Sequence, residues 1–149
     1  GPTGSAAPIP YYGEIFAYSN STAQTLTQNT WAVITTLDIA GAGAGVTINT
    51  VDHTLTITKQ AVYHINYSVS FIGVITHIYE FGLSVGGANP EQSSVVRRQT
   101  GTTDIIVVAG CLLLQCYVSD VLTLRIRDTT ASGGDSTITN ANLNVIELN

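Results

Sequence analysis

The feature that most constrains the fold is a strict alternation of side chains over residues 61–71. Its apolar members are Tyr63, Ile65, Tyr67, Val69 and Phe71, and its polar members are His64, Asn66, Ser68 and Ser70. A period of two residues is that of a half-buried β-strand, because successive side chains of a strand point to opposite faces. The segment therefore predicts a strand with one face in a core. Residues 54–58, 79–85 and 122–126 alternate in the same way and predict further strands.

The composition agrees with an all-β fold. Thr, Ile and Val number 21, 15 and 14 among the 149 residues, so a third of the side chains are β-branched and suit a pleated surface. Clusters of Gly, Asn, Asp, Ser and Thr separate about ten short predicted strands, as in a sandwich or barrel. The length fits one domain. We assign residues 1–11 to a stalk or linker and residues 12–149 to the domain, because Pro8 and Pro10 favour an extended lead-in.

The charges argue against a nucleic-acid partner, and the longest apolar run argues against a membrane span. Five Lys and Arg against ten Asp and Glu give a net charge of -5, and Lys59 is the single lysine. Such a chain cannot line an extended phosphate track, so we expect no nucleic-acid partner. The longest apolar run, residues 105–114, is half the length of about 20 residues needed by a spanning helix, so we expect no membrane span. A charged fraction of 10% and a mean hydropathy of +0.27 then indicate exposed apolar surface and an obligate homo-oligomer.

The run at 105–114 is apolar on both faces, which predicts a strand that is covered on both sides. The second cover is either another subunit or a loop of the same sandwich. We take the first reading for the candidate interface. Its residues are Ile105, Val107, Cys111, Leu113, Tyr63, Tyr67 and Tyr117.

Three segments are predicted to be exposed loops that could bind a ligand: residues 41–45, 86–91 and 131–135. All three are rich in small or turn-forming residues, and none has the spacing of a phosphate-binding motif. The candidate binding residues in them are Gly43, Asn89, Glu91 and Asp135.

No motif predicts catalysis or a cofactor. Residues 82–86 match the pattern Gly-x-Ser-x-Gly, but Ser84 lies inside the strand predicted over residues 79–85 and not on the strand-to-helix turn that makes a nucleophile elbow. His53, His64 and His77 lack the spacing of metal ligands. Cys111 and Cys116 are five residues apart, which places them on opposite faces of a strand, and we interpret them as two buried free thiols. We therefore expect no enzyme.

Two groups of charged residues have a structural and a functional interpretation. Asp120 follows Ser119 at a turn, where its carboxylate would cap backbone N–H groups. The alternative is a calcium ion on an oligomer axis, for which no calcium-binding spacing is present. Its other candidate ligands are Asp104, Asp128 and Asp135. The pair at residues 97–98 is interpreted as solvated edge arginines, of which at most one serves any given surface.

The order of several segments resembles a known family. Residues 1–6 read GPTGSA, two Gly-X-Y triplets; residues 61–65 read AVYHI, 81–87 read FGLSVGG, 116–124 read CYVSDVLTL, and 144–148 read NVIEL. This series resembles the globular head of the complement q-subcomponent and tumour-necrosis-factor-like superfamily. Ala61 and Ser119 stand where that family favours Gly.

The resemblance implies a ten-stranded jelly-roll sandwich that packs as a tight homotrimer at the end of a collagen-like stalk. The Thr-containing triplet and the Lys-poor head are most similar to collagen-like glycoproteins of the bacterial spore surface (exosporium, BclA type). The implied function is a non-enzymatic trimerisation head that nucleates the stalk and forms its tip on an extracellular surface. Other surface-layer proteins or a host ligand would be further partners. The alternative is a receptor- or ligand-binding adhesion module, such as a phage or viral fibre tip, that acts through its loops.

Overall fold

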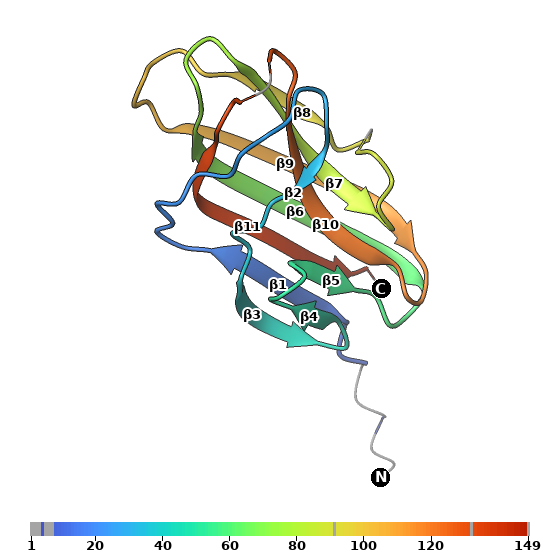
Figure 1. Cartoon of the computed structure of the whole chain (residues 1–149). Coiled ribbons are helices and arrows are strands. Elements are labelled where there is room, and N and C mark those ends of the chain that lie inside the picture. The colour runs from blue at the N-terminus through green and yellow to red at the C-terminus, as the bar shows by residue number, and fades with distance from the viewer. Residues whose placement is uncertain (1–3, 5–7, 91, 132, 149) are drawn as a thin grey trace.

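The computed structural model describes residues 4, 8–90, 92–131 and 133–148, and within them the chain is an all-β sandwich without helices (Figure 1). The strands are β1 (Tyr12–Ala17), β2 (Ala32–Val33), β3 (Ile39–Ala44), β4 (Thr47–Asn49), β5 (Thr54–Thr56), β6 (Ala61–Ile72), β7 (Ile78–Val85), β8 (Val95–Arg98), β9 (Ile106–Cys116), β10 (Val121–Asp128) and β11 (Thr137–Glu147). The predicted fold class is confirmed, and the short β2 is an addition to the ten strands expected. No helix in this described part of the chain is long and apolar enough to cross a membrane.

Two antiparallel sheets form the layers of the sandwich. The first, which we call the β6 sheet, has the order β3-β1-β11-β6-β9. The second, the β10 sheet, has the order β4-β5-β10-β7-β8, and β2 also pairs with β10. Strands that follow one another in the chain lie in different sheets at several points, as in a jelly roll. Figure 1 shows the two sheets facing each other, with β1 beginning at one end of the sandwich.

The core lies between the sheets and follows the predicted alternation. Every odd residue of β6 from Tyr63 to Phe71 is buried, whereas the even residues point away from the core. In the facing sheet, Tyr79 and Phe81 of β7 are fully buried. The Phe71 ring contacts both, with centroids 5.4 Å from Tyr79 and 4.8 Å from Phe81. These contacts connect the two sheets through aromatic side chains, which bury large apolar areas.

The register of β9 resolves the run with two apolar faces. β9 pairs with β6 so that Leu112 lies opposite Ile65 and Leu113 lies opposite His64. Leu112 is therefore buried in the core, whereas Leu113 remains 58% exposed on the other side of the sheet. Within the subunit this strand is covered on one face only.

The segment at 41–45, predicted to be a loop, is mostly strand. Residues 41–44 belong to β3, which pairs with β1 along the edge of the β6 sheet. Small residues suit this position because side chains of neighbouring strands lie close to the backbone: a Cβ on Gly43 would approach Ile48 Cδ1 to 2.8 Å. Gly45, with a φ of 76°, then makes the tight turn into β4. The prediction of an exposed loop was wrong for residues 41–44.

The sandwich has two ends with different loops. At the N-terminal end, β1 begins at Tyr12, which pairs with Ala44 and so lies beside the β3–β4 turn. The loop after Val85 and the β9–β10 turn lie at the same end and are adjacent, because Leu122 pairs with Val85. At the distal end, Asp128 pairs with Tyr79. The described segments there are residues 18–31, 73–77, 99–105, 129–131 and 133–136. Residues 1–3 and 5–7, which hold most of the two Gly-X-Y triplets, lie outside the described part of the chain.

Candidate subunit interface

The outer face of the β6 sheet is formed by the side chains that point away from the core. We use this name for the face made by Tyr12, Glu14 and Phe16 of β1, Asn140, Asn142, Asn144 and Ile146 of β11, Val62, His64, Asn66, Ser68 and Ser70 of β6, and Val107, Ala109, Cys111, Leu113 and Gln115 of β9. The registers align these residues in rows across the strands. One such row runs from Tyr12 through Ile146 and His64 to Leu113.

Apolar side chains lie exposed on this outer face. Leu113 is 58% exposed, Val107 56% and Ile146 41%, and Val62 is exposed beside them. Val62 lies close to Leu113, because it pairs with Gln115, two residues further along β9, and Ile146 lies on the far side of His64, which pairs with Leu113. Val107 is six residues before Leu113, about 20 Å away along the strand. An exposed apolar patch of this kind, made here by Val62, Leu113 and Ile146, indicates a surface that associates with another molecule.

The middle of the outer face is polar and internally hydrogen-bonded. Asn144 Nδ2 donates to Asn142 Oδ1 over 2.7 Å, and Asn142 Nδ2 donates to Glu14 Oε2 over 3.1 Å. Asn66 lies opposite Asn144 on the next strand. A shallow hollow of about 350 Å³ lies over the β1 side of these residues and is lined by Tyr12, Glu14, Ala42, Asn144 and Ile146, among others. Polar groups within an apolar interface favour one arrangement of the partners over others, because misplaced polar groups would stay unpaired.

Five of the predicted interface residues are exposed. Val107, Cys111 and Leu113 lie together on the outer face of the β6 sheet. Ile105 precedes β9 and is 61% exposed, and Tyr117 follows β9 and is 54% exposed. These five residues are therefore available to a partner.

Tyr63 and Tyr67, also predicted at the interface, lie in the core of the subunit instead. They are at odd positions of β6, which face the second sheet. The hydroxyl of Tyr63 donates to Lys59 O over 2.8 Å, and that of Tyr67 donates to Ser93 O. Burial raises the pKa of each tyrosine to about 12, so both hydroxyls remain protonated donors. Their assignment to an interface was wrong, because the strand's other face is the exposed one.

The two cysteines lie on opposite faces, as their odd spacing predicted. Cys116 is buried, as predicted, but Cys111 is exposed on the outer face. The prediction of a buried thiol was wrong for Cys111, because the register places it opposite Asn66, on the side of the sheet away from the core. Burial, with a smaller contribution from Asp120, raises the pKa of the Cys116 thiol to about 11, so this thiol is unreactive at neutral pH. Asp120 Oδ2 accepts a hydrogen bond from Tyr117 N over 2.8 Å, which confirms the predicted capping of the turn.

The histidines have separate structural environments. His64 points outward from β6, as predicted, His53 Nδ1 lies 2.9 Å from Leu37 O, and His77 Nδ1 lies 2.5 Å from Asp128 Oδ2. No sequence motif indicated the His77 and Asp128 pair, because the two residues are 51 positions apart. Among the residues that the structure describes, no three His, Cys, Asp or Glu side chains are grouped as for a metal ion.

The predicted loop residues do not form one binding surface. Gly43 lies within β3, and Asn89 lies in the loop between β7 and β8 at the N-terminal end of the sandwich. Asp135 lies at the distal end, beyond Asp128. Glu91 falls outside the described residues. Positions far apart along the strands cannot contact one small ligand together.

The comparisons with known proteins agree on the fold. No protein-family model matches the chain, and no curated protein sequence matches it. Among solved structures, it is similar to the globular domain of zebrafish complement 1qA, with a TM-score of 0.64 and 15% identity over 93% of this chain and 98% of that one. It is also similar to murine APRIL (0.61, 12%, 94% and 100%) and to Eiger TNF from S. frugiperda (0.60, 11%, 95% and 94%). The chain has the complement C1q/TNF fold. The resemblance inferred from the sequence is thereby confirmed at the level of the fold.

In this C1q/TNF-like sandwich, a buried glutamate connects the segment before β1 to the end of β11. Glu147, at the end of β11, is only 6% exposed. Its Oε1 lies 2.6 Å from Lys59 Nζ, and its Oε2 accepts a hydrogen bond from Tyr11 N over 3.0 Å. The backbone N of Glu147 also donates to Tyr11 O over 2.8 Å. We call this arrangement the Glu147 clamp; it fixes the residue at which the chain enters the sandwich.

The Glu147 clamp predicts a pH dependence. The hydrogen bond from Lys59, followed by that from the Tyr11 amide, holds the pKa of the Glu147 carboxyl below its ordinary 4.5. A lowered pKa in the folded state adds stability above the unfolded-state value, and this contribution is lost as the pH falls through the folded-state pKa. We expect Glu147→Gln to lower the melting temperature at pH 7, with a difference from the wild type that shrinks below pH 4.5. Thermal melts from pH 7 to 3 check this, and a difference independent of pH would contradict it.

Proposed function

We propose that the protein is a non-enzymatic trimerisation head, in which three copies pack through the outer face of the β6 sheet. The observation that carries the proposal is the exposure of Leu113, Val107 and Ile146 on an ordered sheet that is sealed on its other side by the core. The C1q/TNF-like fold supports three as the number of copies, since its members assemble as trimers. Cyclic symmetry closes such an assembly, so that no copy of the interface remains exposed.

We infer that the head directs the assembly of a collagen-like stalk and stands at the exposed tip of a surface filament. Collagen chains need register among three strands, and a trimeric head brings three chain ends together at high effective concentration. The Glu147 clamp supports this role, because it attaches the lead-in at Tyr11 firmly to the last strand. An extracellular location, of the exosporium type, is the setting we propose for such a filament.

The test is the molar mass in dilute solution, measured by light scattering after size exclusion. We expect three times the 15.7 kDa of one chain, at all concentrations that can be measured. A well-behaved monomer of 15.7 kDa would contradict the trimer and, with it, the role in assembling a stalk.

A second function, ligand binding on the exposed flank of the head, is favoured by a different observation. The arginines gather on the β10 sheet, which is the layer opposite the proposed interface. Both functions are compatible within one head, because they use opposite layers.

A further inference from the structure

The positive charge of the chain is concentrated on one sheet. All four arginines lie on β8 (Arg97 and Arg98) and β10 (Arg125 and Arg127), and both strands pair with β7. The fifth cation, Lys59, and eight of the ten acidic residues lie outside these three strands. The other two acidic residues are Glu80 on β7 and Asp128 at the buried end of β10. A chain with a net charge of -5 therefore carries a positive area, which is the opposite of its overall character.

The strand registers place three of these arginines on one face. Arg98 pairs with Ile78, Arg127 with Glu80 and Arg125 with Gly82, which are alternate residues of β7. Alternate residues share a face, and successive pairs are about 6.6 Å apart along a strand. Arg98, Arg125 and Arg127 therefore point outward from the β10 sheet, away from the core. Arg97 pairs with Tyr79 and points to the other side of β8.

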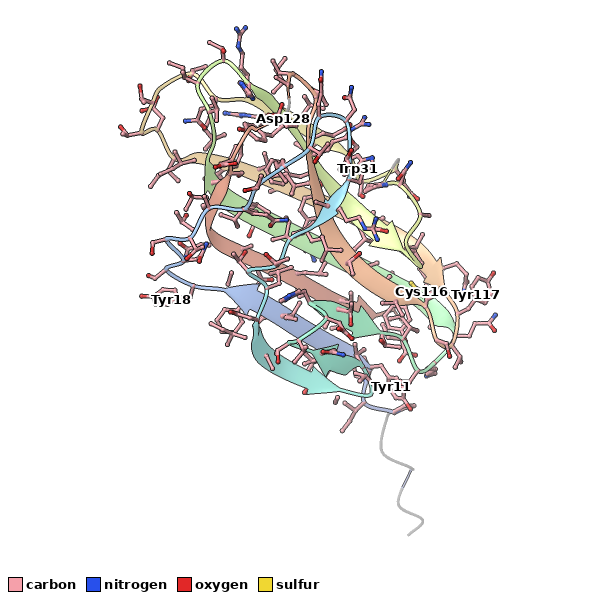
Figure 2. The ribbon with its side chains drawn as sticks, viewed as in Figure 1. Tyr11, Tyr18, Trp31, Cys116, Tyr117 and Asp128 are labelled. Carbon is pink, nitrogen blue, oxygen red and sulfur yellow. The ribbon has the colours of Figure 1, made fainter. Side chains whose placement is uncertain are left out.

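Arg127 is held in place by its neighbours. Its Nη2 lies 2.6 Å from Glu80 Oε1, and its guanidinium carbon lies 4.7 Å from the centre of the Trp31 ring. Ser94 Oγ donates to Glu80 Oε2 over 2.8 Å and fixes the carboxylate. Figure 2 shows Trp31 beside the end of the β10 sheet, where β2 begins. Arg127 is therefore not a free charge: it is paired with Glu80 and lies over the Trp31 ring. We call these two side chains the Arg127–Trp31 pair.

Arg98 and Arg125 have no such partners. Neither makes an ion pair or a side-chain hydrogen bond with any residue that the structure describes. The Nε–H of Arg125 is buried and has no acceptor there. An unpaired buried donor on a charged group is costly, so such groups are found with a partner in nearly all proteins.

Protection of a sheet edge explains only part of this pattern. Charges on an edge strand prevent pairing with other chains, and β8 is such an edge. That role accounts for Arg97 and Arg98. It does not account for Arg125, which lies on β10 in the interior of the sheet and is half-buried.

We propose that this face binds an acidic polysaccharide through its carboxylate groups. Its ligand-binding residues are Arg98, Arg125 and the Arg127–Trp31 pair. A guanidinium offers paired donors that match the two oxygens of a carboxylate. The rest of the surface is mainly acidic, so it would repel a ligand with closely spaced negative charges. The ligand must therefore carry widely spaced charges. Nucleic acid, with one charge per about 1.7 Å of duplex, would extend over the acidic remainder of the head. A polysaccharide with one carboxylate in each disaccharide avoids that repulsion.

The site lies within one subunit and rests on the ligand-binding function proposed for the head, not on the trimer. If the trimer forms through the β6 sheet, three such sites face outward on its flanks. A long polysaccharide that reaches two of them would then bind with avidity. Binding of a short oligosaccharide is independent of assembly, so the two proposals fail separately.

The experiment titrates the whole chain with a short hyaluronan oligosaccharide at low ionic strength. Trp31, the single tryptophan, reports binding by its fluorescence because it contacts Arg127. We expect saturable binding that weakens with added salt. Arg98→Gln and Arg125→Gln should each weaken it about tenfold, the effect of losing one charged hydrogen bond.

Arg97→Gln is the matched control, since it changes the same charge on the same strand but on the opposite side. We expect it to keep the affinity within about twofold. An equal loss in R97Q and R98Q would overturn the site, because only net charge would then matter. Absence of hyaluronan binding, or tighter binding of oligothymidylate or polyglutamate of equal charge, would overturn the ligand class. Hyaluronan binding by a chain of monomeric mass would contradict only the trimer.

Discussion

Leu113→Asp should give a folded subunit that no longer forms a trimer. Leu113 is 58% exposed in the single subunit and lies in the row with His64 and Ile146 on the outer face of the β6 sheet. A carboxylate there does not disturb the core, but in a trimer it would be buried without a partner. Such a charge costs about 3 kcal/mol or more at each contact, which is at least about a hundredfold in affinity. Light scattering with circular dichroism measures both the mass and the fold.

Two further variants make this result specific. Leu112→Asp changes the neighbouring residue, which is 8% exposed and faces the core, and we expect it to unfold the subunit. Val96→Asp changes a side chain of similar exposure, 55%, on the opposite sheet, and it should leave the trimer intact. A soluble trimer of Leu113→Asp would contradict the interface, and a folded Leu112→Asp would contradict the register of β9.

Cys111 offers a second readout of the same interface. It lies two residues before Leu113 on the same face of β9 and opposite Asn66. In the trimer we expect it to be inaccessible to a thiol reagent, and in the Leu113→Asp monomer we expect it to react. Cys116 is buried and should react only after unfolding. Rapid labelling of Cys111 in an intact trimer would place the interface elsewhere.

The core was predictable from the sequence because alternation alone assigns each side chain of a strand to a face. In β6 the odd positions are aromatic or branched and the even positions are polar, so only one orientation buries the apolar side chains. β9 could not be assigned in this way, because Leu112, Leu113 and Leu114 follow one another. Only the pairing with β6 decides which of them enters the core.

The candidate sites were less predictable, because they depend on pairing between distant segments. The sequence showed Arg97 and Arg98 as neighbours, but they point to opposite sides of β8. Arg98 instead shares a face with Arg125, since β7 lies between β8 and β10 in the sheet. The Glu147 clamp likewise joins residues 136 positions apart. Composition also misled at β3, where Gly and Ala suggested a loop but serve an edge strand.

A buried polar centre fixes the loops at the distal end of the sandwich. Asp128 is fully buried. Its Oδ2 faces His77 Nδ1 at 2.5 Å, and its Oδ1 accepts a hydrogen bond from Thr130 N over 2.8 Å. There is no room for a side chain at Gly134, where a Cβ would lie 1.7 Å from Asp128 Oδ2. Asp128 thus joins the segment before β7 to the one after β10 (Figure 2).

Asp128→Ala should therefore lower the free energy of unfolding by about 3 kcal/mol, because it leaves His77 and the Thr130 amide without their buried acceptor. Asp135→Ala is the matched control: it removes the same charge from an exposed position of the same loop and should change stability by less than about 0.5 kcal/mol. Urea denaturation measures both values. Hydrogen exchange should show the loss of protection first in residues 73–78, 129–131 and 133–136, since the core strands keep their packing. Equal stability of the two variants would contradict the role of Asp128 in holding the distal loops together.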